Sequence, residues 1–271
     1  MIKITQIEVD GMPLRTQECR STLRGLFSFD RQVVTIETLN DGAIFGRSKT
    51  SSKLPVLNTI IHGGPQTMLD INAVLSTNRE KDFVITTREM GKLHFKADVQ
   101  NRAISTTARA ITCQLLMADP YIYEEEPQSI KLGSLYSTGV IFGAGHGVKF
   151  GEGYGVVFGA ATGAGGILIN RGNTVAYPVI TIEGPCSGIV VENKTTKEVI
   201  EITLALDEDD LLIIDCRPET RGVYLNGERV QNAKTGAGWI KCLPGENVFG
   251  FGRNSVVNKQ HCTVSLQARW L

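Results

Sequence analysis

Short runs of apolar residues, either alternating with polar ones or continuous, make up most of the chain. Residues 1–9 (MIKITQIEV) alternate, and residues 31–39 (RQVVTIETL) are rich in β-branched side chains. Both patterns are typical of β-strands. In residues 108–120, period-two spacing places Ile111, Cys113 and Leu115 on one face of a strand. These patterns predict a mainly β protein.

Turn residues between these runs predict hairpins. Residues 82–89 and 92–99 flank a Met-Gly pair and indicate two antiparallel strands. The Asn-Asp-Gly sequence at 40–42 ends another strand, so we expect a hairpin arm around residues 40–53. Asn226-Gly227 is a pair typical of a two-residue turn.

One segment, residues 65–78, has helical spacing of its apolar residues, at Met68, Leu69, Ile71, Val74 and Leu75. Composition then changes near Pro120, with a second proline and three consecutive glutamates close behind. We therefore expect an N-terminal β domain with about one helix over residues 1–127. Strand-like runs resume at residue 173 and recur at short spacing, which predicts a β-sandwich or jelly roll over 173–271.

The segment between these domains, residues 128–172, is rich in glycine and resembles a nucleotide loop at first sight. Its GxG sequences miss the last glycine of the dinucleotide motif and precede no helical pattern, and Gly-Lys-Ser/Thr is absent. Instead GVIFG, GVKFG and GVVFG repeat from Gly139, Gly147 and Gly155. We interpret them as extended pieces that bury Val and Phe, with a disordered linker as the alternative.

Charge is balanced, with 28 Lys and Arg against 28 Asp and Glu. This balance gives no support to a nucleic-acid-binding surface. No uncharged apolar run is long enough to span a membrane. Glu8 and Asp10 interrupt the apolar run that a signal peptide needs, so we expect no secretion signal. The six cysteines show no CxxC spacing, and we expect all of them to be reduced, buried thiols.

Candidate chemical groups are sparse. We weighed four scattered histidines, an acidic run, a glycosylation sequon and a basic loop: His62, His94, His146, His261, Asp207–Asp210, Asn193 and residues 47–53. None has the spacing of a metal, cofactor or catalytic site, and the acidic run fits a solvated turn better than a calcium loop. We therefore predict no catalytic, cofactor or metal site and no enzymatic activity.

Several segments of the second half resemble, in order, one known family. They are GNTVAYPVITIEG (172–184), ENKTTKEVIEITLAL (192–206), LLIIDCR (211–217), VYLNGE (223–228), LPGENVFGFG (243–252) and the closing LQARWL. Together with ADPYIY at 118–123, they resemble the distal tail proteins of long-tailed, non-contractile phages.

The resemblance implies a fold and a role. Members of that family form a hexameric ring at the end of the tail tube, made by the N-terminal domain, with a galectin-like sandwich outside it. The ring joins the tube protein to the tail-tip protein and to host-binding, receptor-recognising proteins. The expected location is the virion tail tip, after assembly in the bacterial cytoplasm.

A carbohydrate-binding adhesin built on the C-terminal sandwich is the alternative. Sugar sites on sandwiches use exposed aromatic rings, and in this half only Trp239 lacks the alternating pattern of core residues or a place in a terminal strand. A binding module of this kind and a structural hub are separable by a glycan array.

Overall fold

The computed structural model describes most of the chain. The described residues are 2–28, 31–37, 43–76, 79–132, 165–236, 238–252 and 262–271, with backbone alone for 31–37 and 43–50. Two compact units result, one formed by Met1–Glu125 with Arg269–Leu271 and the other by Glu126–Ala268. The chain is mainly β with one helix among the described residues, so the predicted fold class is confirmed.

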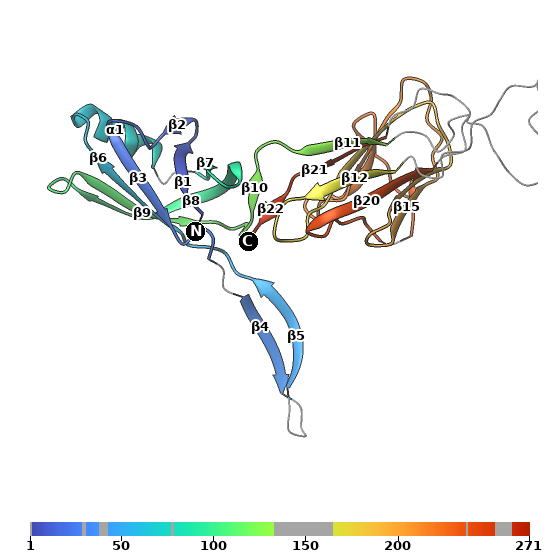
Figure 1. Ribbon diagram of the computed structural model, residues 1–271, viewed down its shortest axis with the longest axis horizontal. Helices are drawn as coiled ribbons and strands as arrows, with labels where there is room; N and C mark the ends of the chain where they lie inside the picture. Colours follow the sequence, from blue (N-terminus) through green and yellow to red (C-terminus); the bar gives the residue numbers. More distant parts are fainter. Residues whose placement is uncertain are drawn as a thin grey trace, which may run out of the picture. The chain divides into compact units, whose positions relative to one another are not determined.

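The first unit is built on one antiparallel sheet (Figure 1). Its main path runs β2-β1-β7-β8-β9-β6-β3, and β10 pairs with both β8 and β22. The strands are β1 (Ile4–Val9), β2 (Met12–Pro13), β3 (Cys19–Arg24), β6 (Val56–Ile61), β7 (Lys81–Thr87), β8 (Gly91–Ser105), β9 (Ala110–Leu116), β10 (Ile122–Glu124) and β22 (Arg269–Trp270).

Alternating burial along these strands places the core on one face of the sheet. Phe83 and Phe95 stack with ring centroids 5.0 Å apart. Ile111, Cys113 and Leu115 are all buried, which confirms the face predicted for β9. The predicted hairpin at Met90-Gly91 is also confirmed, since Thr87 pairs with Gly91.

The predicted helix is α1 (Pro65–Val74), which covers the core face with buried Ile71 and the following Leu75. Pro65 fits the first helical turn, where its missing N–H would have no partner. At the other end the Arg102 guanidinium donates to the carbonyls of Asn72 at 2.9 Å and Leu75 at 3.2 Å. These bonds satisfy free carbonyls and place positive charge at the helix C-terminus.

A separate two-stranded sheet joins β4 (Arg31–Glu37) and β5 (Ala43–Thr50). Within the described backbone these strands pair with each other and with no other strand. The predicted hairpin over this part of the chain is therefore confirmed in its strands, and its turn lies outside the described residues.

The second unit is a sandwich of two antiparallel sheets, ordered β11-β21-β13-β16-β17-β18 and β12-β20-β14-β15-β19. Side chains from both sheets share one core, with Phe249 and Phe251 fully buried in it. The strands are β11 (Gln128–Leu132), β12 (Gly166–Asn170), β13 (Val179–Glu183), β14 (Ile189–Asn193), β15 (Glu198–Ile202), β16 (Leu211–Asp215), β17 (Gly222–Leu225), β18 (Glu228–Arg229), β19 (Lys234–Thr235), β20 (Gly245–Gly252) and β21 (Cys262–Leu266). Asn226 and Gly227, with φ of 51° and 86°, make the predicted turn between β17 and β18.

The units differ in two places from the boundaries expected from sequence. The segment expected to connect the domains, 128–172, contributes β11 and β12 to the sandwich, because apolar side chains such as Leu132 and Leu168 are buried in its core. The closing residues expected in the sandwich form β22, where Trp270 pairs with Ile122 of the first unit. The three GVxFG repeats lie outside the described residues.

Candidate functional site

Strand edges of the first unit are its candidate surfaces for assembly. Strand β3 ends the sheet and has one partner among the described strands, β6. Strands β4 and β5 likewise have one partner each. Such edges carry unpaired backbone N–H and C=O groups that can accept a strand from another chain.

The base of the β4–β5 hairpin is held by Lys53. Its ammonium is buried and donates to the Leu26 carbonyl at 3.0 Å, which ties the chain before the hairpin to the chain after it. The backbone of Lys53 exchanges two hydrogen bonds with Met117. Burial lowers the pKa of Lys53 to about 8. The hairpin thus leaves and re-enters the first unit at one fixed point.

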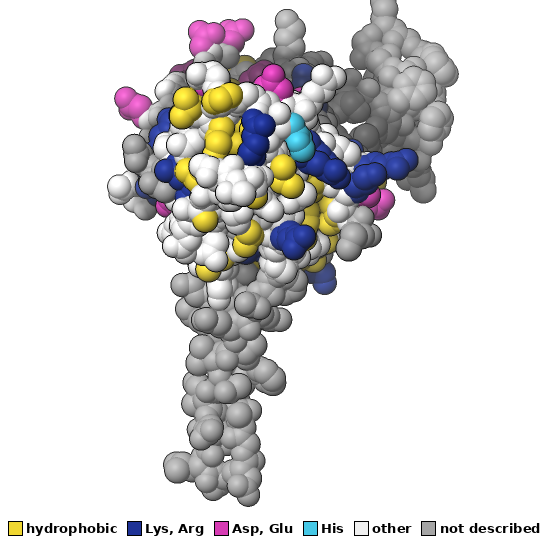
Figure 2. Space-filling view, turned by 90° about the vertical axis from the view of Figure 1, so that its left-hand side faces the viewer, with side chains coloured by type: hydrophobic (Ala, Val, Ile, Leu, Met, Phe, Trp, Pro, Cys, Tyr) yellow, Lys and Arg dark blue, Asp and Glu magenta, His cyan; other side chains and the backbone are white. Residues whose placement is uncertain are grey.

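Figure 2 shows one face of the first unit, with Lys and Arg side chains across its centre and Asp and Glu toward its rim. Two arginines near α1 are engaged in structural contacts. Arg102 binds the end of the helix, and Arg109 donates to the Gly63 carbonyl just before it. Their hydrogen bonds support the fold locally, so these two charges do not by themselves indicate a binding site.

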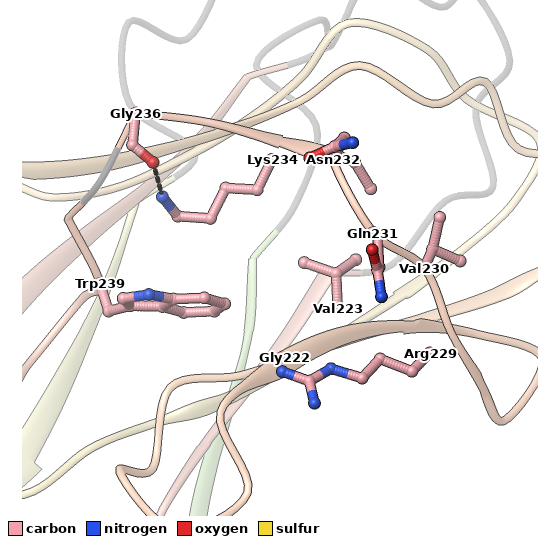
Figure 3. Close-up of a pocket in the computed structure, with 10 residues that line it drawn as sticks. Gly222, Val223, Arg229, Val230, Gln231, Asn232, Lys234, Gly236 and Trp239 are labelled. Atoms are coloured by element: carbon pink, nitrogen blue, oxygen red, sulfur yellow. Dashed lines mark hydrogen bonds between the residues drawn. The ribbon is translucent and has the colours of Figure 1, made fainter.

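The sandwich carries a pocket of about 480 Å³ beside Trp239 (Figure 3). The β17–β18 hairpin, the turn after it and β19 supply its walls, which include Val223, Arg229, Gln231 and Lys234. Trp239, the aromatic residue singled out in the sequence, is half-buried against the sandwich core.

Positive charge surrounds this indole. Lys234 Nζ lies 5.1 Å and Arg221 Cζ 5.7 Å from the centroid of the Trp239 ring. Figure 3 shows the Lys234 side chain extended over the indole, with its ammonium hydrogen-bonded to the Gly236 carbonyl. Burial lowers the pKa of Lys234. Sequence analysis singled out Trp239 but missed the two cations, since only the fold brings Arg221, before β17, and Lys234, in β19, to the same ring.

The other candidates have structural explanations or no shared site. Asp210 Oδ2 accepts from the Asp207 backbone N–H at 2.8 Å, and this bond is the main cause of the lowered pKa of Asp210. The acidic run is therefore held as a turn. No group of three His, Cys, Asp or Glu in the described ranges is arranged to hold a metal ion.

Asn193, the sequon residue, is fully buried in the sandwich. Its Nδ2 donates to the Lys241 carbonyl at 2.8 Å and to Asn247 Oδ1 at 3.2 Å. A side chain so enclosed cannot accept a glycan in the folded protein.

The histidines do not converge in the described part of the chain. His94 is half-buried on β8 and its ring lies 5.6 Å from Tyr123. Burial lowers the pKa of His94. His146 and His261 fall outside the described residues. None of the described helices is long and apolar enough to cross a membrane.

All six cysteines are buried and carry free thiols. Burial raises the pKa of Cys113 to about 11 and that of Cys216 to about 12, which keeps both in the unreactive thiol form at neutral pH.

Comparison with known proteins identifies a related family for part of the chain. Residues 171–270 match the family model of the siphovirus-type tail component, C-terminal domain. The comparison with curated proteins finds no match.

Solved structures add a likeness over nearly the whole chain. The crystal structure of the SPP1 Dit (gp 19.1) protein, described as a paradigm of the hub adsorption apparatus in phages that infect Gram-positive bacteria, matches with TM-score 0.65 and 12% identity. The match covers 98% of this chain and 99% of that one. A chain of the phage P2 baseplate in its activated conformation with Ca matches at TM-score 0.45 and 9% identity, over 96% and 97% of the two chains. Residues 171–270 therefore match the siphovirus-type tail component family, and the resemblance to distal tail proteins found in the sequence is confirmed.

Proposed function

We propose that this protein is a structural hub of a phage tail tip, which forms a ring that joins the tail tube to the tip and host-binding proteins. The observation that carries the proposal is the match of residues 171–270 to the tail-component family. The fold of the whole chain, shared with the SPP1 protein described as a hub, supports it. No catalytic role is proposed.

Assembly rests on the first unit. A closed ring needs a head-to-tail interface in which two different surfaces of one subunit meet. The β4–β5 hairpin provides one surface whose outer edges have no partner among the described strands, and β3, beyond its bridge from Arg15 to Arg20, provides another. Pairing of one copy's hairpin with the next copy would satisfy backbone groups that are otherwise left to water. A net charge of zero means that neighbouring copies repel one another weakly.

The copy number and the partners come from the family resemblance. We propose six copies, contacts with the tube protein, the tip protein and a receptor-binding protein, and a location at the virion tail tip after assembly in the host cytoplasm. The sandwich would then lie outside the ring and make its own contacts with other tail proteins there.

A hairpin replacement tests the assembly proposal. Residues 31–50 are exchanged for a short Gly-Ser linker, which the Lys53–Leu26 contact should allow to close without disturbing the sheet. We expect the variant to fold and to remain monomeric in sedimentation velocity, where the wild type forms a ring. The matched control replaces only residues 38–42 with Gly and Ser and should keep the ring.

The opposite result has a clear meaning. If the 31–50 replacement forms rings as stable as those of the wild type, the hairpin is not the contact. Folding of each variant is checked by circular dichroism, so that loss of the ring is not confused with unfolding of the first unit.

A carbohydrate-binding adhesin is the second candidate, supported by the pocket beside Trp239. Lys234 lies over that ring and the indole is partly buried, so a neutral sugar has little open aromatic surface on which to stack. A glycan array with the intact protein distinguishes the two: binding to several neutral glycans favours the adhesin.

A further inference from the structure

We propose that the pocket beside Trp239 binds a small anionic ligand, a sugar that carries a carboxylate or a phosphate group. The inference concerns the sandwich alone and does not depend on ring formation. It begins from the charges around the pocket, which have no acidic partners in the described residues.

Two cations, Arg229 and Lys234, line the pocket, and none of its lining residues that the structure describes is an Asp or Glu. Arg221 adds a third positive charge next to Trp239. None of the ion pairs found in the described part of the chain includes any of the three. The site therefore holds positive charge that has no ion-pair partner among the described residues.

Backbone carbonyls are the hydrogen-bond partners of these cations. Arg229 Nη2 donates to the Arg221 carbonyl at 3.0 Å, and Arg221 Nη2 reaches the Cys216 carbonyl at 3.5 Å. Lys234 Nζ donates to the carbonyls of Thr235, at 3.2 Å, and Gly236. These contacts hold the two guanidinium groups and the ammonium in place, and they do not neutralise the positive charge.

Fixed cations are suited to an oxyanion. A guanidinium has five N–H donors, and Arg229 uses one of them among the described residues. Charge-assisted bonds from such donors to carboxylate or phosphate oxygens are stronger than neutral ones. The partial burial of Lys234 reduces screening by water, so an anion beside it would be attracted more strongly than at an open surface.

The other lining residues of the pocket favour an anion whose uncharged part is polar. Its volume of about 480 Å³ lies in the range of small-molecule sites. Gln231 and Asn232 add amide donors and acceptors to the wall, and Val223 and Trp239 add apolar surface. Hydroxyl groups and ring carbons of a sugar match this mixture, whereas an apolar ligand would form no hydrogen bonds with the amides and the cations.

Isothermal titration calorimetry on the full-length protein tests the proposal with four probes at equal ionic strength: glucose 6-phosphate, glucuronate, inorganic phosphate and glucose. We expect glucose 6-phosphate or glucuronate to bind and glucose to give no measurable heat at the same concentration. Preference for glucose 6-phosphate identifies a phosphate-bearing ligand, and preference for glucuronate identifies a carboxylate-bearing one.

Variants connect binding to the pocket. Lys234→Met and Arg229→Gln each remove one charge at similar size, and we expect each to weaken binding about tenfold, the size of one charge-assisted bond. Lys194→Met is the matched control, because Lys194 lies in the same unit and pairs with Glu192 at 3.5 Å. It should leave binding unchanged.

Three results would overturn the proposal. Glucose could bind as tightly as the charged sugars, which would make this a neutral sugar site. The Lys194→Met variant could weaken binding as much as Lys234→Met, which would indicate unspecific attraction. Finally, all four probes could fail to produce binding heat at millimolar concentration with folded protein. That result would show that the cations bind neither a carboxylate nor a phosphate sugar.

Discussion

Replacement of Asn247 by Asp should unfold the sandwich at much lower denaturant than the wild type tolerates. Asn247 is fully buried, and its Nδ2 donates to the carbonyls of Leu243 at 2.8 Å and Gly245 at 3.0 Å. Its Oδ1 accepts from the Leu243 N–H at 3.0 Å and from Asn193 Nδ2 at 3.2 Å. A carboxylate keeps the two accepted bonds and loses both donated ones.

The size of the effect follows from these contacts. The two donated hydrogen bonds that the carboxylate loses are worth about 1 kcal/mol each. The oxygen that replaces Nδ2 also carries charge toward two carbonyl oxygens in a buried site, which adds further cost. We expect a loss of about 4 kcal/mol or more in the free energy of unfolding at neutral pH, by addition of these contributions.

The matched control is Asn232→Asp, the same chemical change at an exposed turn residue with φ of 59°. Asp tolerates this left-handed conformation almost as well as Asn, so the control should change stability by about 0.5 kcal/mol or less. Urea unfolding of residues 126–268, followed by circular dichroism, measures both variants with comparable m-values.

Acid should partly rescue Asn247→Asp. Burial and the facing carbonyls would raise the folded-state pKa of the new carboxyl above its unfolded value. The folded state then binds more protons than the unfolded state, and the deficit shrinks as pH falls through the folded pKa. An Asn247→Asp variant as stable as the Asn232→Asp control at neutral pH would refute the role assigned to this network.

Two further predictions concern buried groups. Burial lowers the pKa of Lys53 to about 8, whereas the unfolded chain holds that proton to about pH 10.4. Between these pH values the wild type should therefore gain stability relative to Lys53→Met as pH rises. Parallel curves of unfolding free energy against pH, measured with urea, would contradict this. Iodoacetamide should modify none of the six cysteines in the native protein and all six in denaturant without reductant, as read by mass spectrometry; two or more thiols resistant in denaturant would show disulfides.

Local sequence patterns were sufficient for most of the fold. The alternation in β9 predicts its buried face, the Asn226-Gly227 pair predicts a turn with positive φ, and the spacing over residues 65–78 predicts α1. These features depend on neighbours in the chain, so the sequence contains the information directly.

Contacts between residues far apart in the chain could not be predicted from the sequence in the same way. The pairing of Trp270 with Ile122 joins strands far apart in the chain, and the sequence around Trp270 continues the strand pattern of the sandwich. The charge around Trp239 was also not evident in the sequence: Arg221 precedes β17, Lys234 lies in β19, and only the fold places both cations beside the indole. Buried Asn193 resembled an exposed sequon because its partners, Lys241 and Asn247, are distant in sequence.

The mass of the assembled protein tests the central claim most directly. Sedimentation velocity at micromolar concentration, in low and high salt, compares the full-length chain with residues 126–268. The hub proposal predicts a closed ring for the full-length chain, six copies by family resemblance, that persists in high salt because apolar burial and strand pairing hold it. It predicts a monomer for residues 126–268. A ring formed by residues 126–268 alone, or a full-length chain that stays monomeric in both salts, would contradict a ring held by the first unit.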